Sequence, residues 1–140
     1  MIDIELIRAN PELMRANLEK RGDAEKLSLL DELIEKDRLW RKLKAEADSL
    51  RNCRNILSQQ INSAKKAGQD VSLFLKEAQE IPEKIDSLEK DAADLRQRCS
   101  WILMRLPNIL HGSVPVGKDD SENVVVKASV KPKKPKFEIR

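Results

Sequence analysis

The sequence predicts an all-α protein: a long antiparallel two-helix coiled-coil hairpin with a small N-terminal helical cap and a C-terminal loop or short-strand linker. Of its 140 residues, 36% are charged, 40% are hydrophobic and only 3% are aromatic, a composition typical of long helices and coiled coils. Apolar residues recur at heptad spacing over two stretches, and a turn near 67–70 separates them. Two arms joined by so short a turn are expected to be antiparallel.

The same composition argues against a β-sandwich, a disulfide-rich scaffold and a membrane protein. The longest uncharged stretch, 106–117, is too short for a transmembrane helix and contains two prolines. The N-terminus lacks the basic start and apolar run of a signal peptide. We therefore expect a cytoplasmic protein with no membrane partner, in which Cys53 and Cys99 are reduced.

Residues 1–25 are expected to form two short helices packed at the base of the hairpin. Asp3 is placed to cap the first of them. Asn10 followed by Pro11 is a strong start for the second, because Asn caps the helix and Pro is favoured at its first position. This helix should end near Gly22.

Residues 26–106 form the predicted coiled-coil arm. Counted as 30–66 and 70–106, its two helices would each be about 55 Å long at 1.5 Å per residue. Neither helix could bury its apolar stripe alone, so each must bury that of the other. The first stripe is interrupted at Lys36 and Arg54. The predicted seam comprises Leu33, Trp40, Leu43, Ala47, Leu50, Leu57, Ile61 and Ala64 in the first helix and Phe74, Ala78, Ile81, Ile85, Leu88, Ala92, Leu95, Cys99, Ile102 and Leu106 in the second.

Residues 107–140 read as a linker. Pro107 ends the second arm, and 111–123 is expected to be a loop. Residues 124–126, all valine, could form a short strand. The Lys- and Pro-rich segment 131–136 is typical of a linker. We expect a further domain beyond residue 140.

Charge is distributed unevenly along the first arm. The protein has 27 basic and 24 acidic residues, but 49–69 holds four basic residues and no acidic one. Heptad positions place basic and amide side chains on one continuous helical stripe. Such a stripe suits a phosphate backbone, which is bound by positive charge and hydrogen-bond donors. Its members are Lys44, Arg51, Asn55, Ser58, Asn62 and Lys65.

Two other interpretations of this stripe are open at this point. It could be an ordinary solvated face. Alternatively, the hairpin could be a structural or protein-interaction module without a nucleic-acid partner, which would expose apolar residues outside the seam such as Ile34, Cys53 and Ile56. The stripe contains no aromatic residue, which argues against base stacking on single strands. Recognition of duplex RNA by shape stays compatible with it.

Two irregularities, Arg54 in the seam and Pro82 in the second arm, lie at about the same distance from the turn. One hypothesis is that the proline bends the arm there and lets Arg54 reach solvent. The alternative is a tolerated kink, with Arg54 extending along the surface.

No catalytic, metal-binding or cofactor-binding residues are predicted in this chain. Its single histidine, His111, has no neighbouring ligand cluster. Cys53 and Cys99 would lie roughly 20 Å apart in the hairpin, too far for a disulfide. There is no Gly-rich phosphate loop and no nucleophile–base pair.

Three motifs resemble seryl-tRNA synthetases, in the order and spacing of that family. They are Met1–Arg8 with Asn10-Pro11-Glu12, Arg15, Asn17 and Leu18; Arg54-Asn55-x-Leu57-Ser58-x-x-Ile61 with Ala64-Lys65-Lys66-x-Gly68; and Leu106-Pro107-Asn108-Ile109-Leu110-His111 with the segments 113–119 and 123–124. The chain departs from the family pattern at Leu110, where many members have proline, at Pro82 and over 129–136.

The resemblance implies the N-terminal tRNA-binding domain of a serine–tRNA ligase, a class II aminoacyl-tRNA synthetase. The arm would grip the backbone of the long variable arm of serine tRNA, and selenocysteine tRNA is left open as a second partner. A separate catalytic domain, absent from this chain, would use ATP and Mg²⁺ for serylation, and the parent enzyme would be a homodimer. The expected tRNA-binding residues are Arg51, Arg54, Asn55, Ser58, Asn62, Lys65 and Lys66, with Lys44 and Lys76 as weaker candidates.

Overall fold

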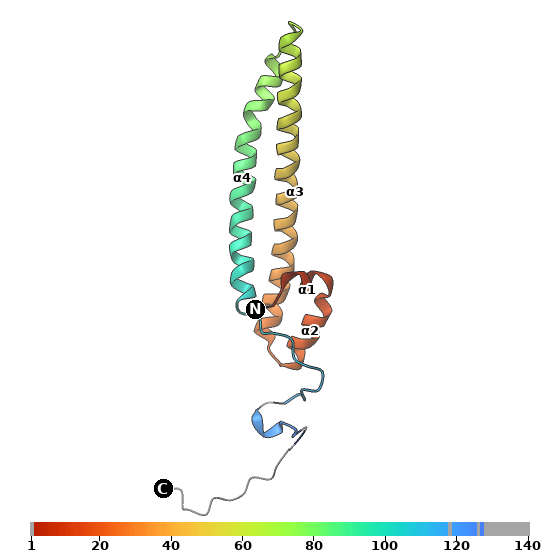
Figure 1. Cartoon of the computed structure of the whole chain (residues 1–140). Coiled ribbons are helices and arrows are strands. Elements are labelled where there is room, and N and C mark those ends of the chain that lie inside the picture. Colours follow the sequence, from red (N-terminus) through yellow and green to blue (C-terminus); the bar gives the residue numbers. More distant parts are fainter. Residues whose placement is uncertain (1, 118, 126, 128–140) are drawn as a thin grey trace, which may run out of the picture. The chain divides into compact units, whose positions relative to one another are not determined.

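A computed structural model describes residues 2–117, 119–125 and 127. The chain divides into two compact units, Met1–Ile109 and Leu110–Arg140. The first unit contains four α-helices and the second a single 3₁₀ turn among its described residues (Figure 1). The elements are α1 (Ile4–Ala9), α2 (Pro11–Lys20), α3 (Ala24–Lys66), α4 (Ser72–Leu103) and η1 (Asp120–Glu122).

Side-chain caps start the first three helices. Asp3 and Asn10 accept backbone N–H groups of α1 and α2 at 2.9 and 3.1 Å, which confirms both predicted caps. Asp23 accepts the backbone N–H of Lys26 at 3.0 Å. Because Asp23 supplies this cap, α3 begins at Ala24, slightly before the start that the apolar pattern indicates.

Two glycines with φ of +67°, Gly22 and Gly68, end α2 and α3. In each case the glycine N–H and the next N–H bond back to carbonyls of the last helical turn. At the end of α3, the Gly68 N–H donates to the Lys65 carbonyl at 3.2 Å, and the Gln69 N–H donates to the Ala64 carbonyl at 3.0 Å. Only glycine adopts this left-handed conformation without strain, so both turns depend on it.

The helices α3 and α4 lie side by side as an antiparallel hairpin, as the sequence predicts (Figure 1). Their contact is built from two apolar clusters rather than one uniform seam. A distal cluster contains Leu57, Ile61, Ile81 and Ile85. A base cluster joins the hairpin to α1 and α2 and contains Ile2, Ile7, Met14, Leu18, Leu30, Leu33, Cys99, Ile102 and Leu106. Between the clusters, the fully buried seam residues are Ala47 and Ala92.

The seam ends short of the tip of the arm. Phe74, which the heptad pattern assigns to the seam, is 36% exposed, and the neighbouring Leu73 is 75% exposed. The last seam residue of α3, Ala64, is small, so little apolar surface is left to cover α4 here. Pro82 stays within α4 with its ring exposed, and Figure 1 shows α4 leaning towards α3 near the tip.

A buried carboxylate, Asp37, joins α1 to α3 at the base. Its side chain is 7% exposed and accepts hydrogen bonds from Arg8 at 2.6 and 3.0 Å and from Arg41 at 3.0 Å. The hydrogen bond with Asp37 raises the pKa of the Arg8 guanidinium. Sequence analysis does not single out Asp37, because its partner Arg8 lies 29 residues away.

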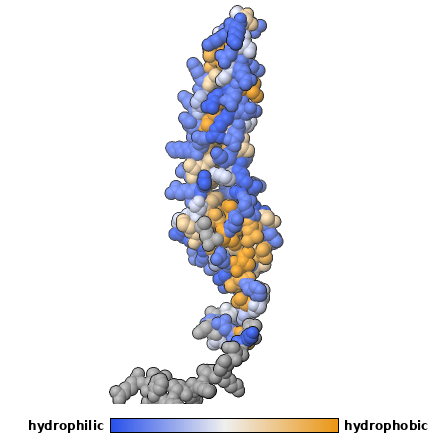
Figure 2. All heavy atoms as spheres, viewed as in Figure 1, coloured by the Kyte–Doolittle hydropathy of each residue, from blue (hydrophilic) through white to orange (hydrophobic). Residues whose placement is uncertain are grey.

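Other contacts at the base link the helices in pairs. Arg98 of α4 binds both carboxylate oxygens of Glu32 of α3 at 2.7 and 2.8 Å, and this hydrogen bonding lowers the pKa of Glu32. Burial raises the pKa of the Cys99 thiol. Figure 2 shows hydrophobic residues gathered at the base, whereas the surface of the arm is mainly hydrophilic. The base also holds the larger apolar cluster, with nine buried residues against four in the distal cluster.

The helix α4 ends at Leu103, and a turn brings Leu106 into the base cluster with 4% exposure. In the second unit, η1 is the regular element of the described residues. The strand considered at 124–126 is not formed at Val124 and Val125, which have no regular structure. Val126 and the segment 131–136 lie outside the described residues.

Replacing Arg8 with Met tests the buried ion pair. It would leave the Asp37 carboxylate buried with Arg41 alone, so we expect a loss of about 2 to 4 kcal/mol in the free energy of unfolding. Urea denaturation measures this change in the free energy of unfolding. The matched control is Arg15→Met, whose partner Asp31 is 55% exposed, and it should cost less than about 1 kcal/mol. Equal losses in the two variants would contradict the role assigned to Asp37.

Replacing Gly68 with Ala tests the turn at the tip. A Cβ at Gly68 would meet no atom within 4 Å, so any cost comes from the left-handed backbone and should be about 1 kcal/mol. Gly112→Ala is the control, since it too has open space and its φ is not left-handed. A neutral Gly68→Ala in thermal or urea unfolding would contradict this account.

Candidate nucleic-acid interface

One edge of the arm is defined by α3 residues spaced by seven, which we call the edge column: Leu30, Asp37, Lys44, Arg51, Ser58 and Lys65. The base of this column is covered, because Leu30 is 0% and Asp37 5% exposed beneath the N-terminal helices. Lys44 and Arg51 are half-buried, and Ser58 and Lys65 are exposed. The column thus changes from buried to exposed along the arm.

The distal part of the edge carries basic and amide side chains that have no partner among the described residues, and we call this group the distal edge: Arg54, Asn55, Asn62, Lys65 and Lys66. Within the described residues, no side chain forms an ion pair or hydrogen bond with that of Arg54, Lys65 or Lys66. Among the described residues, the amides of Asn55 and Asn62 likewise make no side-chain hydrogen bond, and both residues are exposed. Arg54 is exposed, which agrees both with a bend at Pro82 and with a side chain that extends along the surface. These residues are available to an external ligand, and their contact with RNA stays a prediction.

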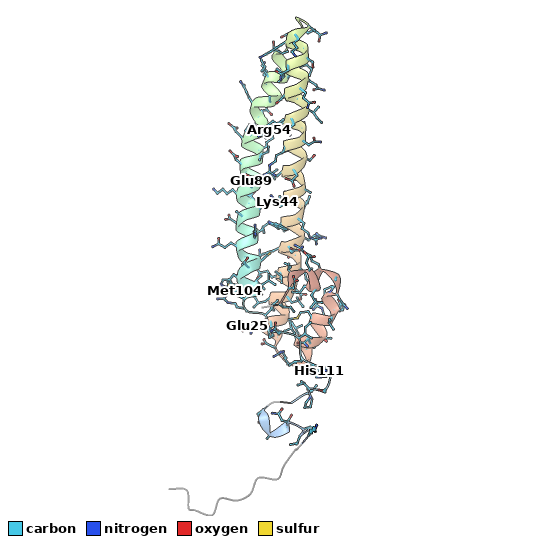
Figure 3. All side chains as sticks on the ribbon, in the orientation of Figure 1. Glu25, Lys44, Arg54, Glu89, Met104 and His111 are labelled. Carbon is cyan, nitrogen blue, oxygen red and sulfur yellow. The ribbon has the colours of Figure 1, made fainter. Side chains whose placement is uncertain are left out.

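Arg51 differs from the other candidates because it is already ion-paired. It contacts Asp48 on its own helix and Glu89 on α4, and its side chain is 33% exposed. The acid-free stretch 49–69 does not reveal these partners, because one lies just before it and the other on the facing helix. Figure 3 shows Glu89 of α4 and Lys44 and Arg54 of α3 along the arm.

Ser58 also has its donor engaged. Its hydroxyl donates to the backbone carbonyl of Arg54 at 2.8 Å. The hydroxyl oxygen is exposed, but its proton is committed to the helix. Ser58 is therefore a weaker donor to a phosphate than the sequence pattern indicates.

Lys44 and Lys76, the weaker candidates, have different surroundings. Lys76 is exposed on α4. Lys44 lines a hollow of about 220 Å³ together with Trp40 of α3 and Arg96 of α4. The heptad pattern does not single out Arg96, because Arg96 lies near Lys44 only when the two helices are paired.

No cluster of metal ligands accompanies this edge in the described part of the chain. Across 2–117, 119–125 and 127, no three His, Cys, Asp or Glu residues are grouped to hold a metal ion. Cys53 and Cys99 are free thiols, the first exposed and the second buried. His111 Nδ1 lies 2.8 Å from the Ser113 hydroxyl. No described helix combines the length and apolarity needed to cross a bilayer.

The fold is that of a helical-arm domain: a coiled-coil hairpin with a helical cap. The family model described as the seryl-tRNA synthetase N-terminal domain matches residues 1–110. The chain belongs to this family.

Similar proteins agree with this assignment. A serine–tRNA ligase of Methanoculleus marisnigri is 48% identical over 139 residues, covering 99% of this chain and 33% of that protein. One from Thermococcus onnurineus is 46% identical over 127 residues, covering 91% and 28%. The chain therefore spans about a third of the length of the curated relatives it matches.

Solved structures show the same fold. The crystal structure of seryl-tRNA synthetase from Pyrococcus horikoshii complexed with ATP matches with a TM-score of 0.83 and 43% identity, covering 89% of this chain and 28% of that chain. Cytoplasmic serine–tRNA ligase from Naegleria fowleri in complex with AMP matches with a TM-score of 0.71 at 24% identity, covering 95% and 29%, and supports the fold alone.

Replacing Glu89 with Gln tests whether Arg51 takes part in binding RNA. The change removes the interhelical partner of Arg51, so we expect affinity for serine tRNA to rise about threefold to tenfold at low salt, and less at high salt. Fluorescence anisotropy at two salt concentrations measures it. The control is Glu83→Gln, an exposed carboxylate of α4 without an ion pair in the described residues. Equal effects would place Arg51 outside the interface.

Proposed function

We propose that this chain is the tRNA-binding arm of a seryl-tRNA synthetase, and that its distal edge binds the backbone of the long variable arm of serine tRNA. The observation that carries the proposal is a group of three basic side chains on the hairpin of this chain that form no ion pair among the described residues: Arg54, Lys65 and Lys66. The chain's membership of the seryl-tRNA synthetase family supports it. Basic residues held without carboxylate partners are suited to neutralising phosphates.

Recognition in this proposal depends on shape and charge rather than base edges. The edge offers cations and the amides Asn55 and Asn62, which donate to phosphate or ribose oxygens. From Lys44 to Lys65 the column extends about 31 Å at 1.5 Å per residue. A rigid helix of that length contacts an RNA duplex at several points along its backbone, which favours tRNAs with a long helical variable arm.

We further propose that the parent protein attaches serine to tRNA in the cytoplasm as a homodimer. A class II catalytic domain outside this chain would carry out the reaction with ATP and Mg²⁺. Support comes from the relatives, which are serine–tRNA ligases, one of them crystallised with ATP. This chain would contribute binding and orientation of the tRNA. Selenocysteine tRNA is a second candidate ligand.

The alternative of a hairpin without a nucleic-acid partner has less support. Of its three candidate docking residues, Ile34 packs against the base cluster. Ile56 and Cys53 are exposed, the former by 47%. Two such residues do not form an extended apolar surface, and family membership favours the tRNA-binding interpretation.

The double variant Lys65→Gln/Lys66→Gln tests the proposal. Loss of two phosphate contacts should weaken binding of serine tRNA about tenfold to a hundredfold and lower the magnitude of the salt slope by about 0.7 to 0.9 per contact. The control is Lys42→Gln/Lys90→Gln, with the same charge change at exposed positions. Binding is measured by anisotropy from 50 to 300 mM salt.

A second comparison uses serine tRNA with a shortened variable arm. We expect it to bind the unsubstituted chain more weakly than full-length serine tRNA and to lose less affinity in the double variant. If the two lysine pairs behave alike, or if the shortened tRNA binds equally well, the distal edge does not bind the variable arm.

A further inference from the structure

A groove continues the edge column towards the base of the hairpin. It consists of two hollows, of about 220 and 270 Å³, that share Trp40 and Arg96. The outer hollow is also lined by Lys44, Glu89, Ala92 and Ala93. The inner hollow reaches α1 at Ile4 and includes Arg8 and Asp37. The groove therefore connects the exposed edge with the buried ion pair at the base.

The carboxylates in this groove are engaged elsewhere. Glu89 is ion-paired with Arg51, and Asp37 with Arg8 and Arg41. In contrast, Lys44 and Arg96 have no ion-pair partner among the described residues.

Two cations, one from each long helix, thus line the same hollow, and the carboxylate that shares it, Glu89, is ion-paired with Arg51. Their mutual repulsion is reduced when an anion binds in the hollow. The small side chains of Ala92 and Ala93 on α4 leave access to Trp40, which is half-buried.

We propose that this groove is a second RNA-backbone site, in which Lys44 and Arg96 hold a phosphate of the same tRNA. The inference rests on the proposed function, since the occupant is identified by continuity with the edge column. Lys44 lies seven residues from Arg51 and fourteen from Ser58, about 10 and 21 Å along the helix. A nucleic-acid backbone that follows the distal edge meets the groove next. Arg96 is then a contact residue on α4, and Trp40 packs against the adjoining ribose.

The experiment compares Arg96→Gln with Lys90→Gln in the 140-residue chain. Both residues are exposed on α4, but Lys90 does not line the groove. Arg96→Gln should weaken serine tRNA binding about fivefold to tenfold and lower the salt slope by about 0.7 to 0.9. Lys90→Gln should have a smaller effect on both the affinity for serine tRNA and the salt slope. Arg96→Lys keeps the charge and should retain most of the slope, and circular dichroism checks that each variant is helical.

Tryptophan emission gives a local readout. The chain has two tryptophans, so Trp101→Phe leaves Trp40 as the sole reporter in the groove. Serine tRNA should change its emission, and Arg96→Gln should abolish most of that change. A polyglutamate peptide is the comparison ligand. If it produces the same change and displaces the tRNA from the groove, the site takes acidic polymers in general and the RNA assignment is overturned.

The two proposals fail in different ways. If the unsubstituted chain binds serine tRNA and Lys65→Gln/Lys66→Gln weakens binding, while Arg96→Gln matches Lys90→Gln, the groove site alone is overturned. If the unsubstituted chain does not bind serine tRNA, the proposed function is overturned together with this inference.

Discussion

Mutual burial of the apolar stripes of α3 and α4 is the constraint on which the rest of the unit depends. Each helix alone would leave a stripe of Leu and Ile in water, at about 25 cal/mol for each Å² of apolar surface. Pairing removes this cost and also fixes which side chains face outward. Glu89 and Arg96 of α4 lie next to the edge column of α3 only because the two helices are paired in this register.

The N-terminal helices divide this edge into a covered and an uncovered part. They bury Leu30 and Asp37 at the base, and Arg8 joins Arg41 in pairing with the carboxylate that is buried there. Beyond them the same column becomes basic and accessible. The two N-terminal helices therefore have two effects: they stabilise the base of the hairpin, and they set where the accessible edge begins.

Much of the fold follows from short-range patterns in the sequence. Heptad spacing predicts the hairpin, Asp3 and Asn10 predict helix starts, and Gly22 and Gly68 predict turns, because each of these features depends on residues within a few positions. The exposed positions of Lys65 and Lys66 follow in the same way.

Features that depend on long-range neighbours could not be predicted. Asp37 appears as an ordinary polar residue until α1 covers it, and Arg51 appears unpaired until Glu89 is placed opposite. Arg96 and Lys44 line the same hollow only because the hairpin brings α3 and α4 together. The valines at 124 and 125 favour a strand by local propensity, but the described part of the second unit offers no neighbouring strand to pair with them.

The separation of the seam into two clusters affects how the arm opens. The distal cluster holds the outer part of the hairpin, and towards the base it is followed by a stretch where the fully buried seam residues are Ala47 and Ala92. Local unfolding that starts at the tip therefore reaches Lys65 and Lys66 first, and it reaches Arg54 only once this cluster is lost. Any ligand that holds those three cations in their folded arrangement opposes that opening, so binding at the edge and rigidity of the outer arm are thermodynamically linked.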